Sequence, residues 1–570
     1  MKRVSLLLCV VVLVSMVAAC GATPAPQVIT EKVVETVVVQ GTPQIVEKEV
    51  TKVVETEKII TATPEPEQGP AVGGTLVYAL SSEPDTLDVH KSGDVFIPCQ
   101  FFGAGLVARD PKTGEFIPYL AKSWTATPDN MTYEFKLRDD VVFHNGAPLT
   151  AQDYAFTFMR AINPETRSPT AGQTLVGLAQ AEATDDHTLV LHFAQPNPVL
   201  LNSMSNNCYL QPLPQAAVEQ MGDDFGRNPI GVGPYKFKEW VTGEKIVLER
   251  NPDFTWGPAF TRGGPPYIQT IEFRIIPEYS TQLAGLESGD LDLVSLQTKD
   301  LQRIQDTNKF RILSTGLNGT GIHMEMNTTV APFNDVRVRQ ALNYAVDRDT
   351  INQVVEGGHA QPLYGPLTPS TVGYWPGVEY VGYHYGVDKA KALLTEAGYA
   401  LSADGVFAKD GQPLALTLVF AGNHQKVAEI VQEQFKAAGI QVELQQLEYG
   451  VLQQALSAGD FGIAIDQQGW PDAGILYVLF FSATIGGYNH SRVTNLDGLF
   501  MPFFLANGRE AFNQAAGDIQ RAVVENAYFV PIYAPMAYYA VSNKIQGPLD
   551  SPADRWLYLF DAYIETGPKQ

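Results

Sequence analysis

The sequence predicts an α/β protein with two lobes, built from mixed sheets with flanking helices and a cleft between the lobes. Residues 414–466 alternate as strand, helix, strand, helix, strand, an order that implies a parallel sheet with right-handed crossovers. A strand, a turn and a capped helix follow one another over 131–159. The pattern changes character around 322–327, where a second lobe is expected to begin. The 570 residues are enough for two or three domains.

The first residues have the pattern of an export signal. Lys2 and Arg3 precede an apolar run at 4–16 that is too short to span a bilayer as a mature helix. Small residues then lead to Cys20, as in a bacterial lipobox. We expect a lipoprotein signal peptide at 1–19 and acyl chains on Cys20 that anchor the chain to a membrane. Ordinary signal cleavage beside an incidental cysteine is the alternative.

Residues 20–71 are expected to form a flexible linker after the lipidated cysteine. A near repeat, Glu-Lys-Val-Val-Glu-Thr at 31–36 and Thr-Lys-Val-Val-Glu-Thr at 51–56, is flanked by prolines, and the segment has no aromatic residue. Few of its positions could pack a core, which favours a tether between the membrane and the folded body. The alternative is that the Val-Val pairs form strands with a partner.

The elements of the body are read from periodicity and capping. Apolar and polar residues alternate over 131–137, the period of a half-buried strand, and Asn145-Gly146 is a turn signal. Thr150 stands at an N-cap position, with Asp153 in the first turn of the helix that follows. The same periodicities predict strands at 76–80, 188–193, 246–254 and 271–275, and helices at 338–346, 387–394, 427–438, 451–458 and 512–524.

Polar residues and a tryptophan follow the last strand of the parallel unit. Ligands of parallel sheets bind beyond the carboxyl ends of the strands. The strand-end segment there comprises Gln467, Gln468, Gly469, Trp470 and Asp472. Trp470 could stack on a ligand or pack in the core. Asp472 could pair with a ligand ammonium in a closed cleft or cap a helix.

Two cysteines remain after Cys9 and Cys20 at the N-terminus. Cys99 and Cys208 make an even pair in an exported chain, where a disulfide is permitted. A disulfide between them and two separate buried thiols are both open on the sequence alone.

Charge and motifs exclude several function classes. A net charge of −23 argues against nucleic acid and against a polybasic membrane surface. The sequence has no HExxH, GxSxG, P-loop, CxxC or GxGxxG motif, so neither an enzyme nor a cofactor is expected. The nine histidines show no metal-ligand pairing, and we expect no metal site. A secreted hydrolase with paired carboxylates is the enzymatic alternative.

Three segments resemble a single protein family. They read SWTATPDNMTYEFKLRDDVVFHNGAPLTAQDYAF at 123–156, IGVGPYKFKEW at 230–240 and FNDVRVRQALNYAVDRDTI at 333–351. They are similar to motifs of the family 5 extracellular solute-binding proteins, the oligopeptide, dipeptide and nickel receptors of ABC importers. The resemblance covers residues 72–565.

The resemblance implies a periplasmic-binding-protein fold of type II, in which the chain returns to its first lobe near the C-terminus. We expect lobe 1 at 72–321 with an extra subdomain at about 119–228, lobe 2 at 322–532, and the return to lobe 1 at 533–570.

The resemblance also implies site residues. Peptide-binding members carry "W..DY.DP", whose first Asp holds the peptide amino terminus. The corresponding segment here, 470–473, is shorter, and Asp472 matches either acidic position. Tyr488 and Asn489 resemble a family segment at the cleft, although a turn role is open for Asn489. Tyr533 near the lobe return is a further candidate, and His323 is the histidine to watch for a nickel role.

The predicted function is capture of a solute, above all an oligopeptide or dipeptide, in the interlobe cleft by hinge closure. An oligosaccharide or a nickel complex is also open. Delivery to an ABC permease would follow. We expect an exported monomer, lipid-anchored at the outer face of the cytoplasmic membrane. A ligand sensor or adaptor without transport is the alternative.

Overall fold

The computed structural model of the chain describes residues 28–39, 42–53, 70–92, 96–169, 171–175, 177–205, 208–549 and 559–565. It divides into an N-terminal unit, Met1–Gly69, and a body, Pro70–Gln570. The predicted signal peptide and Cys20 lie outside the described residues. Within the described residues, no helix is both long enough and apolar enough to cross a membrane.

The N-terminal unit contains a two-stranded antiparallel sheet. Strand β1 (Val28–Val39) pairs with β2 (Thr42–Val53), from the pair Val28 and Val53 to the pair Val39 and Thr42. This differs from the flexible linker expected for the segment. Both strands are rich in β-branched residues, which favour an extended chain. The partner of each strand is therefore the other strand of the same chain.

Lobe 1 is the part of the body around a seven-stranded mixed sheet. In spatial order its strands are β10 (Tyr235–Val241), β11 (Lys245–Arg250), β12 (Thr270–Ile275), β3 (Thr75–Leu80), β13 (Leu293–Leu296), β24 (Met536–Ser542) and β14 (Phe310–Gly316). Strand β24 comes from the C-terminal part of the chain and pairs antiparallel with both β13 and β14. The C-terminal part of the chain thus completes the sheet that the N-terminal part begins.

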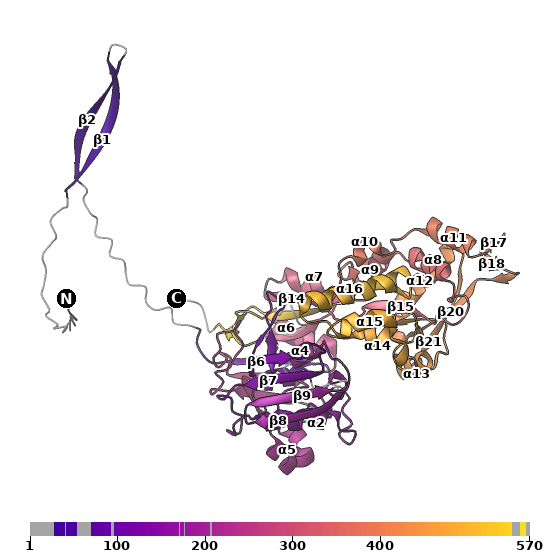
Figure 1. Cartoon of the computed structure of the whole chain (residues 1–570), viewed down its shortest axis with the longest axis horizontal. Coiled ribbons are helices and arrows are strands. Elements are labelled where there is room, and N and C mark those ends of the chain that lie inside the picture. The colour runs from indigo at the N-terminus through magenta and orange to yellow at the C-terminus, as the bar shows by residue number, and fades with distance from the viewer. Residues whose placement is uncertain are drawn as a thin grey trace, which may run out of the picture. The chain divides into compact units, whose positions relative to one another are not determined.

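A second, antiparallel sheet belongs to lobe 1. Its four strands are β6 (Ala121–Ala126), β7 (Thr132–Leu137), β9 (Thr188–Phe193) and β8 (Leu178–Asp185). Helix α2 (Ala151–Ile162) packs against β8 and β9, as Figure 1 shows. Residues of both sheets belong to one buried apolar cluster, in which Phe135, Phe158 and Phe273 are inaccessible to solvent.

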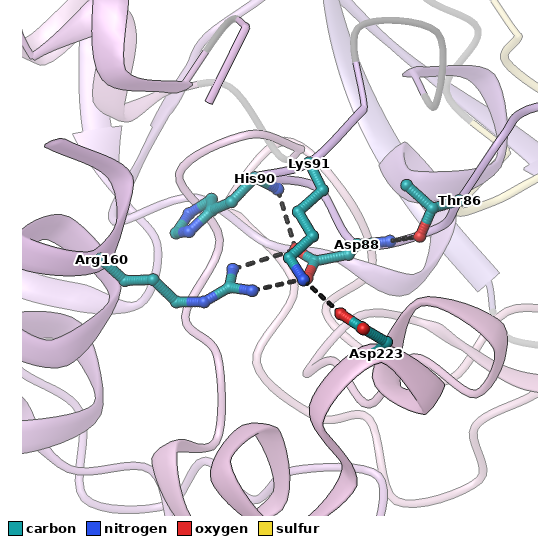
Figure 2. Close-up of polar contacts among 6 residues, drawn as sticks. All are labelled: Thr86, Asp88, His90, Lys91, Arg160 and Asp223. Carbon is teal, nitrogen blue, oxygen red and sulfur yellow. Dashed lines mark hydrogen bonds and ion pairs between the residues drawn. The ribbon is translucent and has the colours of Figure 1, made fainter. Parts of the chain in front are cut away.

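A buried ion pair fixes α2 to the segment after β3 (Figure 2). The Arg160 guanidinium donates two hydrogen bonds to Asp88, of 3.0 and 2.6 Å, and the backbone N–H of His90 donates to the same carboxylate. Burial alone raises the pKa of Asp88, but Arg160 and the His90 N–H outweigh it, so the pKa lies below its usual value. Beside it, Lys91 and Asp223 form an exposed pair at 2.6 Å.

Lobe 2 is the part of the body around a six-stranded mixed sheet. In spatial order its strands are β16 (Gln361–Pro362), β23 (Phe529–Ala534), β15 (Ile322–Met326), β22 (Ile463–Asp466), β20 (Ala415–Ala421) and β21 (Gln441–Leu447). Strand β20 pairs parallel with both β21 and β22, with α12 (Gln425–Ala437) and α13 (Tyr449–Ala458) as the crossovers. The predicted β-α-β-α-β unit is confirmed.

Helices cover both lobes. In lobe 1 they are α1 (Phe96–Phe102), α3 (Ala171–Thr174), α4 (Leu200–Met204), α5 (Gln215–Met221), α6 (Tyr279–Ser288) and α7 (Leu301–Asp306). In lobe 2 they are α8 (Val336–Ala345), α9 (Arg348–Glu356), α10 (Val378–Val381), α11 (Val387–Glu396), α14 (Gly474–Phe480), α15 (Asp497–Phe504) and α16 (Arg509–Glu525). Figure 1 shows α8, α9 and α12 gathered around the strands of lobe 2.

Short elements complete the body. Two-residue and three-residue strands form small sheets: β4 (Val107–Arg109) with β5 (Phe116–Pro118), β17 (Ala400–Leu401) with β18 (Phe407–Lys409) and β19 (Gln412–Pro413), and β25 (Ile545–Gln546) with β26 (Tyr563–Ile564). The 3-10 helices are η1 (Gly222–Arg227), η2 (Thr298–Asp300), η3 (Gly422–His424) and η4 (Ser482–Thr484).

The chain passes between the two large sheets twice. Residues 317–321 connect β14 of lobe 1 to β15 of lobe 2, and Pro535 alone connects β23 of lobe 2 to β24 of lobe 1. The two crossings lie together, because the N–H of Leu317 donates to the carbonyl of Pro535 at 3.2 Å. A short paired connection of this kind is where a hinge between lobes would form.

Candidate functional site

The strand-end segment lies where β22 leaves the sheet of lobe 2, next to the crossing between the lobes. The backbone N–H of Gln468 donates to the Thr320 hydroxyl at 3.0 Å, and the N–H of Thr320 donates back to the Gln468 carbonyl at 3.0 Å. Gly319, at φ 110°, is so close to the segment that a Cβ there would lie 1.9 Å from the Gln468 carbonyl. The segment is therefore fixed to the residues that join the lobes.

Asp472 joins the segment to lobe 1. Its carboxylate accepts hydrogen bonds from the Asn202 amide at 2.7 Å and from the Gly474 N–H at 2.7 Å, and also from the Trp470 indole. The side chain is 1% exposed, and burial raises the pKa of Asp472 to about 6, although these donors and the positive charge of Arg109 oppose the shift. In this arrangement Asp472 binds groups of the protein, and Asn202 is its partner across the lobes.

Trp470 lies half-buried beside Asp472. It packs against an apolar cluster of lobe 2 that includes Leu367, Ala473 and Leu476. The sequence left stacking on a ligand and core packing open for this side chain. The structure gives it core contacts on one side, partial exposure on the other, and a hydrogen bond to Asp472.

A buried polar cluster includes Asp466, the residue directly before the strand-end segment. Glu325 on β15, Asp466 at the end of β22 and His490 from the loop before α15 place their ligand atoms within 4.8 Å of one another. His490 Nδ1 and Glu325 Oε1 are 2.8 Å apart, and both side chains are 1% exposed. Burial lowers the pKa of His490, but Glu325 and Asp466 outweigh burial and raise it above its usual value. Burial raises the pKa of Asp466.

Two exposed tyrosines stand near this cluster. Tyr449, at the start of α13, is 56% exposed, and Tyr488 is 44% exposed. Burial raises the pKa of Tyr449, with the charges of Asp466 and Tyr488 adding to the shift. The Tyr488 and His490 ring centres are 6.1 Å apart. Exposed amphipathic rings and buried carboxylates suit a ligand that has both apolar and cationic groups.

The other predicted site residues have different surroundings. The Gln468 amide donates to Asp466 at 2.7 Å, so this side chain orients a member of the buried cluster. Asn489 is 1% exposed; its amide donates to the carbonyls of Phe481 and Val493, and its oxygen accepts from the Val493 N–H. The structure thus gives Asn489 the turn role instead of an accessible position.

Tyr533 is also buried. It lies in β23, is 3% exposed and belongs to the apolar core of lobe 2, so it has no accessible face in this arrangement. In the pairing of β15 with β23, Tyr533 lies opposite Ile322. Burial raises its pKa. The reason for the difference is that the strand before the lobe return runs through the core, buried along its whole length.

The structure joins Cys99 and Cys208 in a disulfide, with the Cα atoms 5.3 Å apart. It links α1 to the turn after α4, and both cysteines are inaccessible to solvent.

His323 is buried at 1% exposure and stacks on Phe529, with the ring centres 4.2 Å apart.

Sequence reasoning missed Asn202, Glu325, Asp466 and His490. A usable signal existed for Glu325, since it stands two residues from His323 on one strand, and period-two spacing places both side chains on one face. His490 directly follows a residue that was singled out. No local sequence pattern indicates the register that brings β15 beside β22. None indicates the contact of α4 with the strand-end segment either.

Comparison with known proteins agrees with this architecture. The model of the bacterial extracellular solute-binding proteins, family 5, middle part, matches residues 115–487. The chain is 30% identical to the periplasmic oligopeptide-binding protein OppA of Haemophilus influenzae, over 86% of this chain and 93% of that protein. It is 27% identical to the oligopeptide-binding protein AppA of Bacillus subtilis, over 84% and 89%.

A solved structure extends the likeness to three dimensions. The AppA protein of Bacillus subtilis in complex with a nonapeptide superposes with a TM-score of 0.66 at 26% identity, over 87% of this chain and 100% of that chain. The predicted two-lobed α/β fold is confirmed. The chain belongs to the family 5 bacterial extracellular solute-binding proteins.

Proposed function

We propose that this solute-binding protein captures an oligopeptide between its lobes and passes it to the permease of an ABC importer. The observation that carries the proposal is the contact of Asp472 in lobe 2 with Asn202 in lobe 1. A ligand held at the strand-end segment would touch both lobes, and closure about the paired crossings would enclose it. The two curated relatives are both named as oligopeptide-binding proteins.

The chemistry of the segment suits a peptide. The half-buried Trp470 and the exposed Tyr449 and Tyr488 offer flat surfaces for side chains or for the peptide backbone. Asp472 becomes available to a peptide amino terminus when the lobes separate, because its amide partner belongs to the other lobe. A charge-assisted hydrogen bond in the enclosed cleft would then replace the contact with Asn202.

Calorimetry with a peptide panel tests the proposal. Peptides of three to nine residues should bind saturably at one site and raise the melting temperature, since a ligand of the folded state stabilises it. Trp470→Ala should weaken binding while the chain stays folded. Trp124→Ala is the matched control, because Trp124 is also half-buried but lies in the four-stranded sheet of lobe 1. A panel of peptides, oligosaccharides and nickel complexes without any thermal shift would contradict capture of a solute.

Two finer points belong to the same proposal. Export with a lipid on Cys20 would hold the receptor at the outer face of the cytoplasmic membrane, and Cys20→Ser should move the chain from the membrane fraction to the soluble fraction.

A receptor without enzymatic activity should return its bound peptide intact, which mass spectrometry of the released ligand checks. Recovery of cleaved peptide would favour the hydrolase alternative.

A further inference from the structure

The buried cluster of Glu325, Asp466 and His490 has the donor groups of a metal site. Three segments that are distant in sequence supply one donor each, and all three residues are at most 2% exposed. Imidazole nitrogen and carboxylate oxygen together form the ligand set of many zinc, nickel and cobalt sites. The donor atoms lie within 4.8 Å of one another, and His490 Nδ1 and Glu325 Oε1 are 2.8 Å apart. Binding an ion at roughly 2.1 Å would move this pair apart and bring Asp466 closer.

The charges of the cluster also favour a bound cation. Two carboxylates face one imidazole, and in the described part of the chain no lysine or arginine forms an ion pair with Glu325 or Asp466. A buried carboxylate without a compensating charge is costly, and either a proton or a bound cation removes that cost. The closest compensating group is His490 itself, whose hydrogen bond goes to Glu325.

His323 lies next to the cluster but is not one of the three residues whose donor atoms lie within 4.8 Å of one another. His323 lies directly opposite Asp466 in the antiparallel pairing of β15 with β22, so their side chains are on the same face of the sheet. Glu325 is on that face too, because it is two residues from His323 on β15. The Nδ1 of His323 must donate to the Gly321 carbonyl at 3.0 Å, which leaves Nε2 as a bare acceptor. Among the described residues this Nε2 has no hydrogen-bond partner, and His323 is 1% exposed.

Neighbouring side chains already orient the donors. The amides of Gln453 and Gln468 donate to the two oxygens of Asp466, at 3.3 and 2.7 Å. Asn489 closes the loop that carries His490 through its bonds to Phe481 and Val493. Outer contacts of this kind fix the geometry of metal ligands.

We propose that Glu325, Asp466 and His490 bind one divalent transition-metal ion of the zinc, nickel and cobalt class. The ion takes the place of the proton between His490 and Glu325, and that proton leaves to solvent. Bound metal ties the loop carrying Tyr488 and His490 to two strands of lobe 2. This site holds a resident ion and does not depend on the peptide proposed above.

Metal titration of the full, tag-free chain tests the site. After treatment with a chelator, zinc, nickel and cobalt chlorides should each bind at one ion per chain by calorimetry and raise the melting temperature, whereas magnesium chloride should do neither. Asp466→Asn and His490→Gln should weaken binding by more than about 100-fold, and Gln453→Ala by about 10-fold to 100-fold. His187→Gln is the matched control, an exposed histidine in lobe 1, and should leave the affinity unchanged.

Circular dichroism of each metal-free variant shows whether it folds. If His490→Gln does not fold, the metal affinity of Asp466→Asn decides the outcome. The absorption band of bound cobalt gives a second readout that a purely structural effect would not move. Absence of stoichiometric binding overturns the proposal, and so does unchanged affinity in the folded Asp466→Asn variant. Loss of binding in His187→Gln alone would assign the metal to the surface and overturn it as well. Peptide affinity measured in parallel keeps the two proposals separate.

Discussion

Two neighbouring ion pairs in lobe 1 differ in burial and therefore in their expected energetic weight. Arg160 and Asp88 are almost enclosed, with 13% and 2% of their side chains exposed. Lys91 and Asp223 are open to water, at 39% and 95%. Removing one partner of an enclosed pair leaves an uncompensated charge, whereas a solvated pair is screened.

We expect Arg160→Gln to lower the free energy of unfolding by about 3–5 kcal/mol, because Asp88 then lies buried without its guanidinium. Lys91→Gln is the control and should not differ measurably from the parent chain. Urea unfolding followed by circular dichroism measures both. The pKa of Asp88 lies below its usual value, so the contribution of the pair is present above pH 4 and is lost as the pH falls. Equal losses in the two variants would contradict this account.

Asp472 gives the opposite dependence on pH. Its folded pKa of about 6 lies above the ordinary value of 3.8, so the folded chain holds the proton more tightly than the unfolded chain between these limits. The free energy of unfolding therefore falls as the pH rises from 4 to 6. Relative to Asp472→Asn, the parent chain should lose on the order of 2 kcal/mol across that range. Urea unfolding at pH 3.5, 5 and 7 measures the difference, and parallel profiles would refute the shift.

At the scale of elements, the disulfide ties α1 to the turn after α4 across 109 residues of chain. Closing a loop of that length restricts the unfolded chain, so Cys99→Ala with Cys208→Ala should reduce the free energy of unfolding by about 2–5 kcal/mol. Reducing agent should then leave the double variant unchanged while it destabilises the parent. Thiol counting on the denatured, unreduced chain should find neither Cys99 nor Cys208 free. A reactive thiol at either position would contradict the bond.

Elements whose pattern is local could be predicted from the sequence. The unit from β20 to β22 was predicted with its order and parallel pairing, because period two and period 3.6 alternate there over short spans. The hairpin of β1 and β2 was not predicted, since charged residues between valines fit a tether as well as a strand. The choice between them depends on pairing that no single strand reveals.

The strand-end rule picked out Trp470 and Asp472 as ligand residues, and their role in binding stays a prediction. The structure places Asp472 in contact with Asn202 of lobe 1. Contacts that depend on register were missed. Asn489 and Tyr533 were chosen by resemblance and are buried instead. Glu325 and His490 are 165 residues apart, and only the folded chain brings them together.

At the scale of the whole body, contacts between the lobes accompany the arrangement described above. Asn130 of lobe 1 donates to the carbonyls of Phe504 and Ala506 at the end of α15, at 3.1 and 2.9 Å. Arg509 of lobe 2 bonds to Glu115 of lobe 1 at 3.0 Å. Together with the contact between Asn202 and Asp472, these bonds favour the state in which the lobes touch. If peptide is held in that state, each contact adds to its affinity.

Asn130→Gly tests the link between lobe contact and affinity. Asn130 has φ 54°, so glycine keeps the backbone conformation and removes the amide that reaches lobe 2. It also removes the oxygen that accepts from the Tyr133 hydroxyl at 3.2 Å, but that hydroxyl keeps its bond to the Asn197 carbonyl at 2.8 Å. Loss of the two hydrogen bonds to lobe 2, one buried and one partly buried, should weaken peptide binding by about 5-fold to 30-fold, since about 1–2 kcal/mol no longer favours the touching state. Asn308→Gly is the matched control, an exposed asparagine with the same φ of 54°. Calorimetry with one peptide compares them; equal affinities in both variants would mean that these contacts do not contribute to ligand capture.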